Sequence, residues 1–192
     1  MRDRFRTSLR LIYHCGLRIS EALSIEVRDI DKQAGRIHIR NGKGSKDRYV
    51  PIGEGMLQEL RRFWSRHQHP KFLFPGMGKG YKFTSKCREV GGVEEEHEAL
   101  KLVQNAKARM SCGTVQNAFK RALAASGIKK AATPHTLRHS YATHMIELGV
   151  NIRYLSMYLG HASLEQTVVY VHLTSVSEGQ TLRAIEELFQ GP

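Results

Sequence analysis

A few residues in this sequence have the types and spacing that are needed to hold an anion and to move a proton. Arg18 follows Gly16, a glycine placed to end a helix, and Lys43 lies between two glycines in a tight turn. His135 and Arg138 are three residues apart at the start of a helical segment, so their side chains share a face. Transfer of a phosphodiester without a metal ion needs cationic groups for the phosphate oxygens, a nucleophile and an acid for the leaving alcohol. The sequence therefore predicts a site that binds a phosphate and can carry out this chemistry.

Each of these residues also has an ordinary interpretation when it is taken alone. Arg18 could be a solvated residue at the start of a helix, as most single arginines are. Lys43 could be a solvated residue at the tip of a hairpin, and Lys32 and Lys46 are nearby competitors for its role. These alternatives stay open until the candidates are considered together.

Two histidines on the same helical segment raise the alternative of a zinc site. His135 and His139 are four residues apart, which is a spacing that zinc ligands can have on a helix. No HExxH pattern accompanies them, and a third ligand would have to come from His144 or His161. A catalytic zinc ion needs a defined set of three protein ligands, so we favour His139 as a structural partner of its helix and expect no bound metal.

The composition favours a nucleic acid as the partner. The 192 residues include 30 Lys+Arg and 18 Asp+Glu, which gives a formal net charge of +12. Such an excess is typical of proteins that bind a polyanion, although a generically basic protein would show it too. Cys15, Cys87 and Cys112 form no CxxC pair, so we expect no disulfide framework and a reducing, cytoplasmic location. No apolar stretch approaches the length that spans a bilayer, so no membrane contact is expected.

The hydrophobic pattern predicts one mainly helical domain over residues 1–192 with a small antiparallel β-sheet. Apolar residues recur at helical spacing and alternate with period two in separate segments. Helices are predicted around residues 9–13, 20–27, 56–64, 114–126, 134–148, 151–159, 163–170 and 177–189, and a hairpin over 36–40 and 48–52. Residues 76–109 lack such a pattern and are predicted to be an insertion or mobile loop.

The expected starts of four helices depend on polar residues that can accept hydrogen bonds from free backbone N–H groups. The predicted caps are Ser20, Thr133, Asn151 and Ser163. The last of these pairs with Gln166 in a capping-box pattern. The helix that follows Thr133 is predicted to bury one apolar face, formed by Leu137, Tyr141, Met145 and Leu148. Tyr154 and Tyr158 on the next helix are interpreted as packing residues as well.

Taken together, the candidates lie in five boxes whose pattern resembles the signature of the tyrosine recombinases, a family that includes phage integrases and Xer-type resolvases. The boxes are Gly16-Leu17-Arg18-Ile19-Ser20-Glu21, Gly42-Lys43-Gly44, His135-Thr136-Leu137-Arg138-His139, Leu159-Gly160-His161 and Tyr170. They occur in the family's order, and the resemblance extends over residues 4–174. It implies the mainly helical tyrosine recombinase catalytic-domain fold and a DNA breaking and rejoining enzyme.

The resemblance also implies which residues bind the phosphate. Arg18 and Arg138 resemble the two arginines that clamp the scissile phosphate. His135 and His161 resemble the histidines that hydrogen-bond beside them. Glu21 occupies the acidic position of the family, where it is expected to orient the catalytic groups.

Three residues resemble those that form bonds or move protons. Tyr170 resembles the nucleophile, which forms a 3′-phosphotyrosine that a 5′-hydroxyl of the partner DNA then attacks. Lys43 resembles the general acid that protonates the departing 5′-hydroxyl, and His135 is the residue expected to accept the proton of the tyrosine. Because the energy of the backbone bond is kept in the phosphotyrosine, we expect neither a metal nor a nucleotide cofactor.

The resemblance also implies the partners and the assembly of this protein. Double-stranded DNA is the expected substrate, bound by a homotetramer, with a monomer left open for the free protein and a nucleoid-associated place in the cytoplasm. Residues 177–192 are predicted to form a carboxyl-terminal tail helix that docks on a neighbouring protomer. Because the chain begins seventeen residues before Arg18, the amino-terminal core-binding domain of the family is expected to be absent.

Two rival functions remain open from the sequence. A type IB topoisomerase would use similar chemistry to relax one duplex without exchanging partners, but the compact Leu159-Gly160-His161 box favours a recombinase. A non-catalytic DNA-binding relic would occupy sites without cutting them. Such a relic would be expected to have lost at least one of the six chemical groups, and the sequence retains them all.

Overall fold

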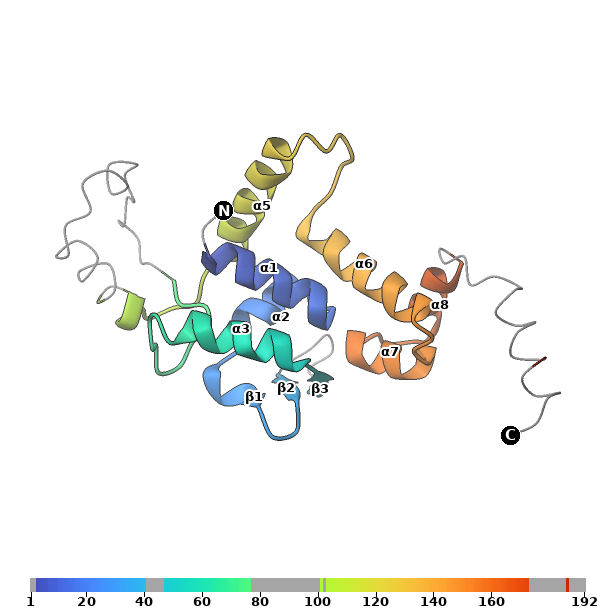
Figure 1. Ribbon diagram of the computed structural model, residues 1–192, viewed down its shortest axis with the longest axis horizontal. Helices are drawn as coiled ribbons and strands as arrows, with labels where there is room; N and C mark the ends of the chain where they lie inside the picture. The colour runs from blue at the N-terminus through green and yellow to red at the C-terminus, as the bar shows by residue number, and fades with distance from the viewer. Residues whose placement is uncertain (1–2, 41–46, 77–100, 102, 173–185, 187–192) are drawn as a thin grey trace.

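The structure is a computed structural model that describes residues 3–40, 47–76, 101, 103–172 and 186 (Figure 1). Its helices are α1 (Asp3–Cys15), α2 (Ile19–Ser24), η1 (Val27–Asp29, a 3-10 turn), α3 (Glu54–Trp64), α5 (Cys112–Ala125), α6 (Pro134–Glu147), α7 (Ile152–Leu159) and α8 (Glu165–Val171). Its strands are β1 (Ile30–Asp31), β2 (Arg36–Ile39) and β3 (Arg48–Pro51), which form one antiparallel sheet. The predicted mainly helical fold with a small antiparallel sheet is therefore confirmed.

Helix α1 lies at the centre of the larger cluster of buried side chains. Leu11, Ile12 and Cys15 on its inner face have no exposed surface. Helices α3, α5 and α6 all contact α1 (Figure 1), and the cluster extends through α2 into the sheet. Full burial of an apolar side chain of this size contributes roughly 1.5–3 kcal/mol, so this cluster holds α1 firmly against its neighbours.

A second, smaller cluster is formed by α6, α7 and α8. Its buried members are Tyr141, Ala142, Ile146, Leu155, Leu159 and Tyr170. Figure 1 shows α7 and α8 beside the carboxyl-terminal half of α6. The two clusters meet at the end of α1, where the ring of Tyr141 lies directly against Gly16. The predicted site residues come from both sides of this junction.

The sheet contains the predicted hairpin and one further strand. Ile37 pairs with Val50 across β2 and β3, and both side chains are buried, as the period-two pattern indicated. Strand β1 was not predicted, because two residues are too few to show alternation; it pairs with the other edge of β2. The turn that carries Lys43 lies outside the described residues.

Two of the predicted helix caps are wrong. Helix α2 begins after Arg18, so Ser20 lies inside its first turn, and the backbone N–H of Arg18 donates to the Glu21 carboxylate at 2.8 Å. Helix α8 begins after Leu164 without a side-chain cap, so the capping box predicted at Ser163 is not formed. Asn151 caps α7 as predicted, because its Oδ1 accepts from the backbone of Arg153. Thr133 likewise precedes α6.

The buried face of α6 also differs from the prediction. Leu148, expected inside, is 79% exposed, whereas Arg138 is buried on the inner face with Tyr141 and Ile146. The hydrophobic pattern could not show this, since it assigns a charged side chain to the solvent face. Tyr154 on α7 is 59% exposed and is therefore not the packing residue that was expected.

Two predicted segments lie largely outside the described residues. They are the insertion at 76–109, of which residues 77–100 and 102 are not described, and the tail helix at 177–192, of which only residue 186 is described. None of the helices in the described part of the chain has the length and apolar character needed to cross a membrane.

Gly16→Ala is predicted to destabilise the protein much more than Gly149→Ala does. Both glycines have left-handed backbones, with φ of +60° and +80°, so alanine is strained by roughly 1 kcal/mol at either position. Only at Gly16 would the added Cβ overlap a neighbour, since it would lie 2.3 Å from a ring carbon of Tyr141. We expect urea unfolding to give losses of about 1 kcal/mol for Gly149→Ala and about 3 kcal/mol for Gly16→Ala. Equal losses would contradict the importance of this close contact.

Candidate active site

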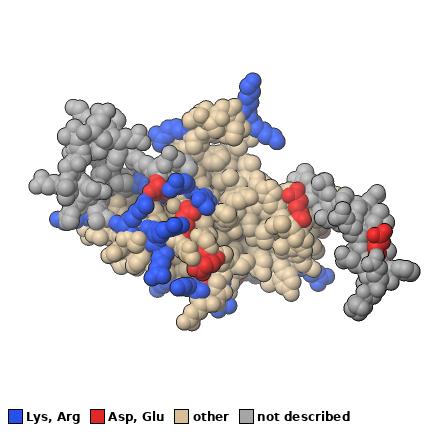
Figure 2. Space-filling model, in the orientation of Figure 1, with Lys and Arg blue, Asp and Glu red and all other residues tan. Residues whose placement is uncertain are grey.

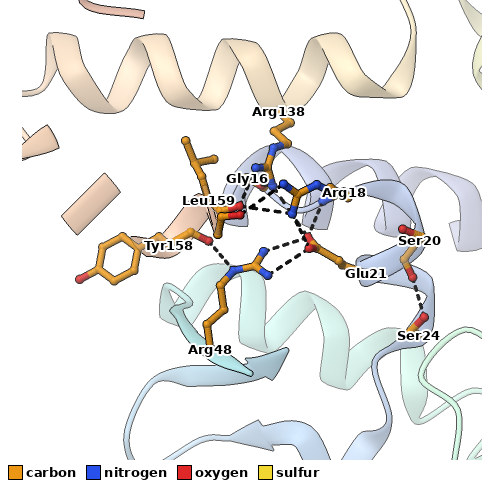
Figure 3. A network of polar contacts seen from close by, with 10 residues as sticks. Gly16, Arg18, Ser20, Glu21, Ser24, Arg48, Arg138, Tyr158 and Leu159 are labelled. Atoms are coloured by element: carbon orange, nitrogen blue, oxygen red, sulfur yellow. Dashed lines mark hydrogen bonds and ion pairs between the residues drawn. The ribbon is translucent and has the colours of Figure 1, made fainter. Parts of the chain in front are cut away.

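Arg138 projects from α6 into the junction between the two buried clusters. Its side chain is only 2% exposed. Its Nη1 donates to the carbonyl of Gly16 at 2.8 Å, and its Nη2 donates to the carbonyl of Leu159 at 2.5 Å. Burial and the nearby charge of Arg18 lower the pKa of Arg138 to about 10, so the group is still cationic at neutral pH. One buried guanidinium therefore joins α6 to the ends of α1 and α7 (Figure 3).

Arg18 reaches the same carbonyl from the start of α2. Its Nη1 lies 3.5 Å from the Leu159 oxygen, and its Nη2 donates to the Gly160 carbonyl at 3.3 Å. Carbonyls at the carboxyl end of a helix attract cations, which explains why both guanidinium groups gather at the end of α7. The Arg18 side chain is 26% exposed, so one arginine of the predicted phosphate clamp is open to solvent and the other is buried.

Glu21 is the counter-charge for these arginines. Its Oε1 accepts from Arg18 Nη1 at 2.8 Å, and its Oε2 lies 3.8 Å from Arg138 Nη1. Arg48 donates to both carboxylate oxygens, at 3.0 and 2.8 Å (Figure 3). Burial of the carboxyl raises its pKa, but hydrogen bonds from Arg48 and Arg18 outweigh burial, so the pKa of Glu21 lies below its ordinary value.

Arg48 is a site residue that the sequence analysis did not single out. Besides its two-pronged contact with Glu21, its Nε donates to the carbonyl of Tyr158 at 2.9 Å. A Cβ on Gly160 would lie 2.9 Å from the Arg48 guanidinium, so the glycine leaves room for it. A signal was available: Arg48 lies two residues before the buried Val50 and so faces inward on its strand. An arginine on an inward face needs a buried counter-charge.

Tyr170 enters the site from α8 and is 5% exposed. Its phenol oxygen lies 2.7 Å from Nδ1 of His139, and its ring stacks against that of His161 with centroids 6.3 Å apart. His161 Nδ1 is hydrogen-bonded to Thr167 Oγ1 at 2.7 Å. Burial raises the pKa of Tyr170, while the charges of Arg138 and Arg18 oppose that rise, so the phenol is protonated at neutral pH.

The histidines of the site are held neutral by their surroundings. Burial, and then the charges of Arg138, Arg18 and Arg48, lower the pKa of His161 to about 4. Partial burial, His139 and the arginines lower the pKa of His135, and partial burial and Arg138 lower that of His139. At neutral pH the positive charge of the site therefore comes from its arginines. The histidines act as neutral groups that can donate or accept hydrogen bonds.

Most of the predicted site residues lie together in the structure. Those brought to the end of α7 are Arg18, Glu21, Arg138, His161 and Tyr170. Lys43 lies outside the described residues. His135 does not make the expected contact with the tyrosine: its ring packs edge-on against His139, with centroids 4.4 Å apart, and it is His139 that contacts the phenol. His139 thus packs against a residue of its own helix, as interpreted from the sequence, and also contacts the phenol of α8. In the described part of the chain, no group of three His, Cys, Asp or Glu side chains could hold a metal ion.

The fold is that of recombinase catalytic domains. The crystal structure of the XerA recombinase matches with a TM-score of 0.64 at 23% identity, covering 99% of this chain and 57% of that one. The catalytic domain of bacteriophage HP1 integrase matches with a TM-score of 0.52 at 21% identity, covering 92% and 79% of the two chains. Identities at this level show the fold alone.

Sequence comparison then identifies the family. The profile of the Phage integrase family matches residues 1–176, so the chain belongs to that family. Tyrosine recombinase XerC of Chlamydia trachomatis is 35% identical over 171 residues, which cover 89% of this chain and 47% of the relative. Tyrosine recombinase XerA of Pyrococcus furiosus is 34% identical over 172 residues, covering 90% and 51%. The chain spans about half the length of these curated relatives.

Arg48→Ala is predicted to destabilise the fold by about 3 kcal/mol, because it leaves the buried Glu21 without its two-pronged partner and frees the Tyr158 carbonyl. Arg48→Lys should recover only part of this loss, since a lysine cannot bond both carboxylate oxygens in the same geometry. Urea unfolding measures both. The exposed Arg153→Ala is the matched control and should change stability little. A loss for Arg48→Ala no larger than for Arg153→Ala would contradict the prediction.

Glu21→Gln is predicted to remove part of the acid sensitivity of the fold. Because the folded-state pKa of Glu21 is lowered, its ionised form stabilises the protein above the ordinary glutamate pKa of roughly 4.3, and this contribution is lost as the pH falls through the folded value. The stability difference between wild type and Glu21→Gln should therefore shrink on acidification in urea unfolding experiments. The exposed Glu147→Gln is the control. A difference independent of pH would show that Glu21 does not act through its charge.

Proposed function

We propose that this chain is the catalytic domain of a tyrosine-type site-specific recombinase, which cuts and rejoins duplex DNA through a 3′-phosphotyrosine on Tyr170. The observation that carries the proposal is the meeting of two arginines and a tyrosine at one helix end. Arg18 and Arg138 both approach the carbonyl of Leu159, and Tyr170 is buried within the electrostatic reach of both. The family and the names of its relatives agree with this function.

The arrangement suits attack of a phenol on a phosphodiester. In the proposed step the Tyr170 oxygen forms a bond to phosphorus and the bond from phosphorus to the 5′-oxygen breaks. Phenolate formation at neutral pH costs roughly 4 kcal/mol for an ordinary tyrosine with a pKa near 10. The charges of Arg18 and Arg138 favour the phenolate and would also hold the non-bridging oxygens of the phosphate. His161 would donate to the same phosphate as a neutral group.

Lys43 is proposed as the general acid that protonates the 5′-oxygen as it leaves. This role rests on the sequence box alone, because the turn is outside the described residues. The phosphotyrosine keeps the energy of the broken bond, so a 5′-hydroxyl can reverse the step without a nucleotide cofactor. Glu21 is proposed to orient Arg18, which it contacts through both backbone and side chain.

Double-stranded DNA is the proposed substrate. The net charge of +12 favours a polyanion. Figure 2 shows many of the Lys and Arg side chains gathered where α1 and α3 lie in Figure 1, and a cleft there of about 300 Å³ is lined by Arg6, Arg10, Arg62 and Arg66 beside Asp3 and Glu59. One matched structure, with a TM-score of 0.67 at 21% identity, is the XerH recombinase bound to its difH substrate; it covers 95% of this chain and 46% of that one.

We also propose an assembly and a cellular location for this chain. Apolar side chains on α7 and α8 are exposed, among them Tyr154, Met157 and Val169, and contact between protomers would cover such groups. We propose a homotetramer on DNA, with residues 177–192 as the segment that docks on a neighbour. A nucleoid-associated place in the cytoplasm follows from a DNA substrate.

Tyr170→Phe is predicted to abolish a covalent adduct with DNA, because the phenol oxygen is the proposed nucleophile. The probe is a library of labelled duplexes with randomised sequence, each nicked so that the cleaved strand diffuses away and traps the adduct. Adducts are separated on denaturing gels. Tyr49→Phe, which alters an exposed tyrosine on β3 outside the site, should form adduct like wild type.

The outcomes of this experiment separate the proposed function from its rivals. An adduct from Tyr170→Phe would overturn the assignment of the nucleophile. Binding of duplexes by wild type without any adduct would instead indicate a non-catalytic DNA-binding protein. If an adduct forms, relaxation of supercoiled DNA without exchange between two sites would indicate a type IB topoisomerase.

A further inference from the structure

His139 occupies the position that a proton acceptor for Tyr170 requires. It follows Arg138 on α6, and its Nδ1 lies 2.7 Å from the phenol oxygen, with the two ring centroids 5.5 Å apart. A general base must lie within hydrogen-bond reach of the proton that it removes. The contact joins α6 directly to α8, so the same helix that carries the buried guanidinium also holds the phenol.

The other two histidines of the site are placed differently. His135 packs edge-on against the His139 ring, and the phenol oxygen is hydrogen-bonded to His139. His161 stacks almost parallel to the Tyr170 ring, at 16°, and its Nδ1 is occupied by Thr167. A stacked ring presents its face, not a ring nitrogen, to its neighbour. Of the three, His139 is the one whose nitrogen meets the phenol oxygen.

Building on the proposed function, we propose that His139, instead of His135, accepts the proton of Tyr170 during DNA cleavage. The phenol O–H bond breaks and its proton moves to Nδ1 of His139. The phenol oxygen forms its bond to phosphorus, and the electron pair of the breaking P–O bond leaves with the 5′-oxygen, which takes a proton from the general acid. In the rejoining step the same proton returns from His139 to the departing phenol oxygen.

The charges around His139 suit this role. Facing it are Arg138 and His135 from α6, Tyr170 from α8 and His161 after α7. Partial burial and Arg138 lower the pKa of His139, so at neutral pH its ring is neutral and can accept a proton. A bound phosphate would oppose the charge of Arg138 and raise the proton affinity of His139. The base would therefore become stronger when DNA occupies the site.

The test compares His139→Asn with His139→Ala. The Oδ1 of an asparagine can take the place of Nδ1 and accept the phenol hydrogen bond, but it cannot carry a proton. Single-turnover adduct formation is measured on the nicked duplex library across a pH series, together with DNA affinity and thermal unfolding. We expect both variants to bind DNA like wild type, to cleave it about 10²–10⁴-fold more slowly at neutral pH, and to regain rate as the pH rises toward that of phenol ionisation.

The same helix offers a matched control. His144 Nδ1 is hydrogen-bonded to the phenol oxygen of Tyr13 at 2.8 Å, which repeats the histidine and tyrosine contact away from the site. His144→Asn should leave the cleavage rate and its pH dependence unchanged. This control separates the loss of a base from a general effect of removing a histidine from α6.

Three results would overturn the inference. Cleavage by His139→Asn at the wild-type rate would show that only the hydrogen bond matters. An equal loss at every pH would show that His139 positions the tyrosine without taking its proton. Absence of a Tyr170-dependent adduct from wild type would remove the proposed function, and the inference with it; a normal wild-type adduct beside an unaffected His139→Asn would remove the inference alone.

Discussion

Three guanidinium groups, from Arg18, Arg48 and Arg138, share one buried carboxylate, that of Glu21, and the structure of the site depends on this balance. Two like charges about 4 Å apart repel each other by roughly 4 kcal/mol near a protein surface, so such a cluster cannot form without compensation. The carboxylate supplies one part of it, and the carbonyls at the end of α7 supply another. Elements far apart in the sequence are thereby held at one point.

The positive charge of the arginines is only partly compensated, and this contributes to the neutral state of the site histidines. One carboxylate faces three guanidinium groups, so the site keeps an excess of positive charge. Burial lowers the pKa of His161 to about 4 and lowers that of His135, and the excess of positive charge, which disfavours any further cation, adds to both shifts. A phosphodiester brings the missing negative charge. In the proposed function, binding of the substrate and activation of the nucleophile would therefore be linked through the same electrostatic field.

Much of this arrangement could be predicted from the sequence, because the helices and the hairpin follow apolar periodicity and the boxes lie at their ends. Other features depend on contacts between distant segments. Arg138 is buried and Arg48 is partly buried because Glu21 and the α7 carbonyls accept their hydrogen bonds, whereas hydropathy alone assigns such residues to the surface. Ser20 is a plausible cap, but the Glu21 carboxylate already satisfies the helix start. The partner of His139 could not be predicted, since α8 approaches α6 only in the folded chain.

The short helix α8 shows how the proposed nucleophile, Tyr170, can be held in place without extensive packing. It has seven residues, and Val168 and Val169 on its surface are exposed, so little apolar packing fixes it. Tyr170 is held by burial of its ring, by the stacked His161 and by one hydrogen bond to His139. A neutral, hydrogen-bonded phenol costs little to keep in place. In the proposed function its oxygen would become reactive only when its proton leaves, and the charge balance of the arginines would make that step depend on a phosphate beside them.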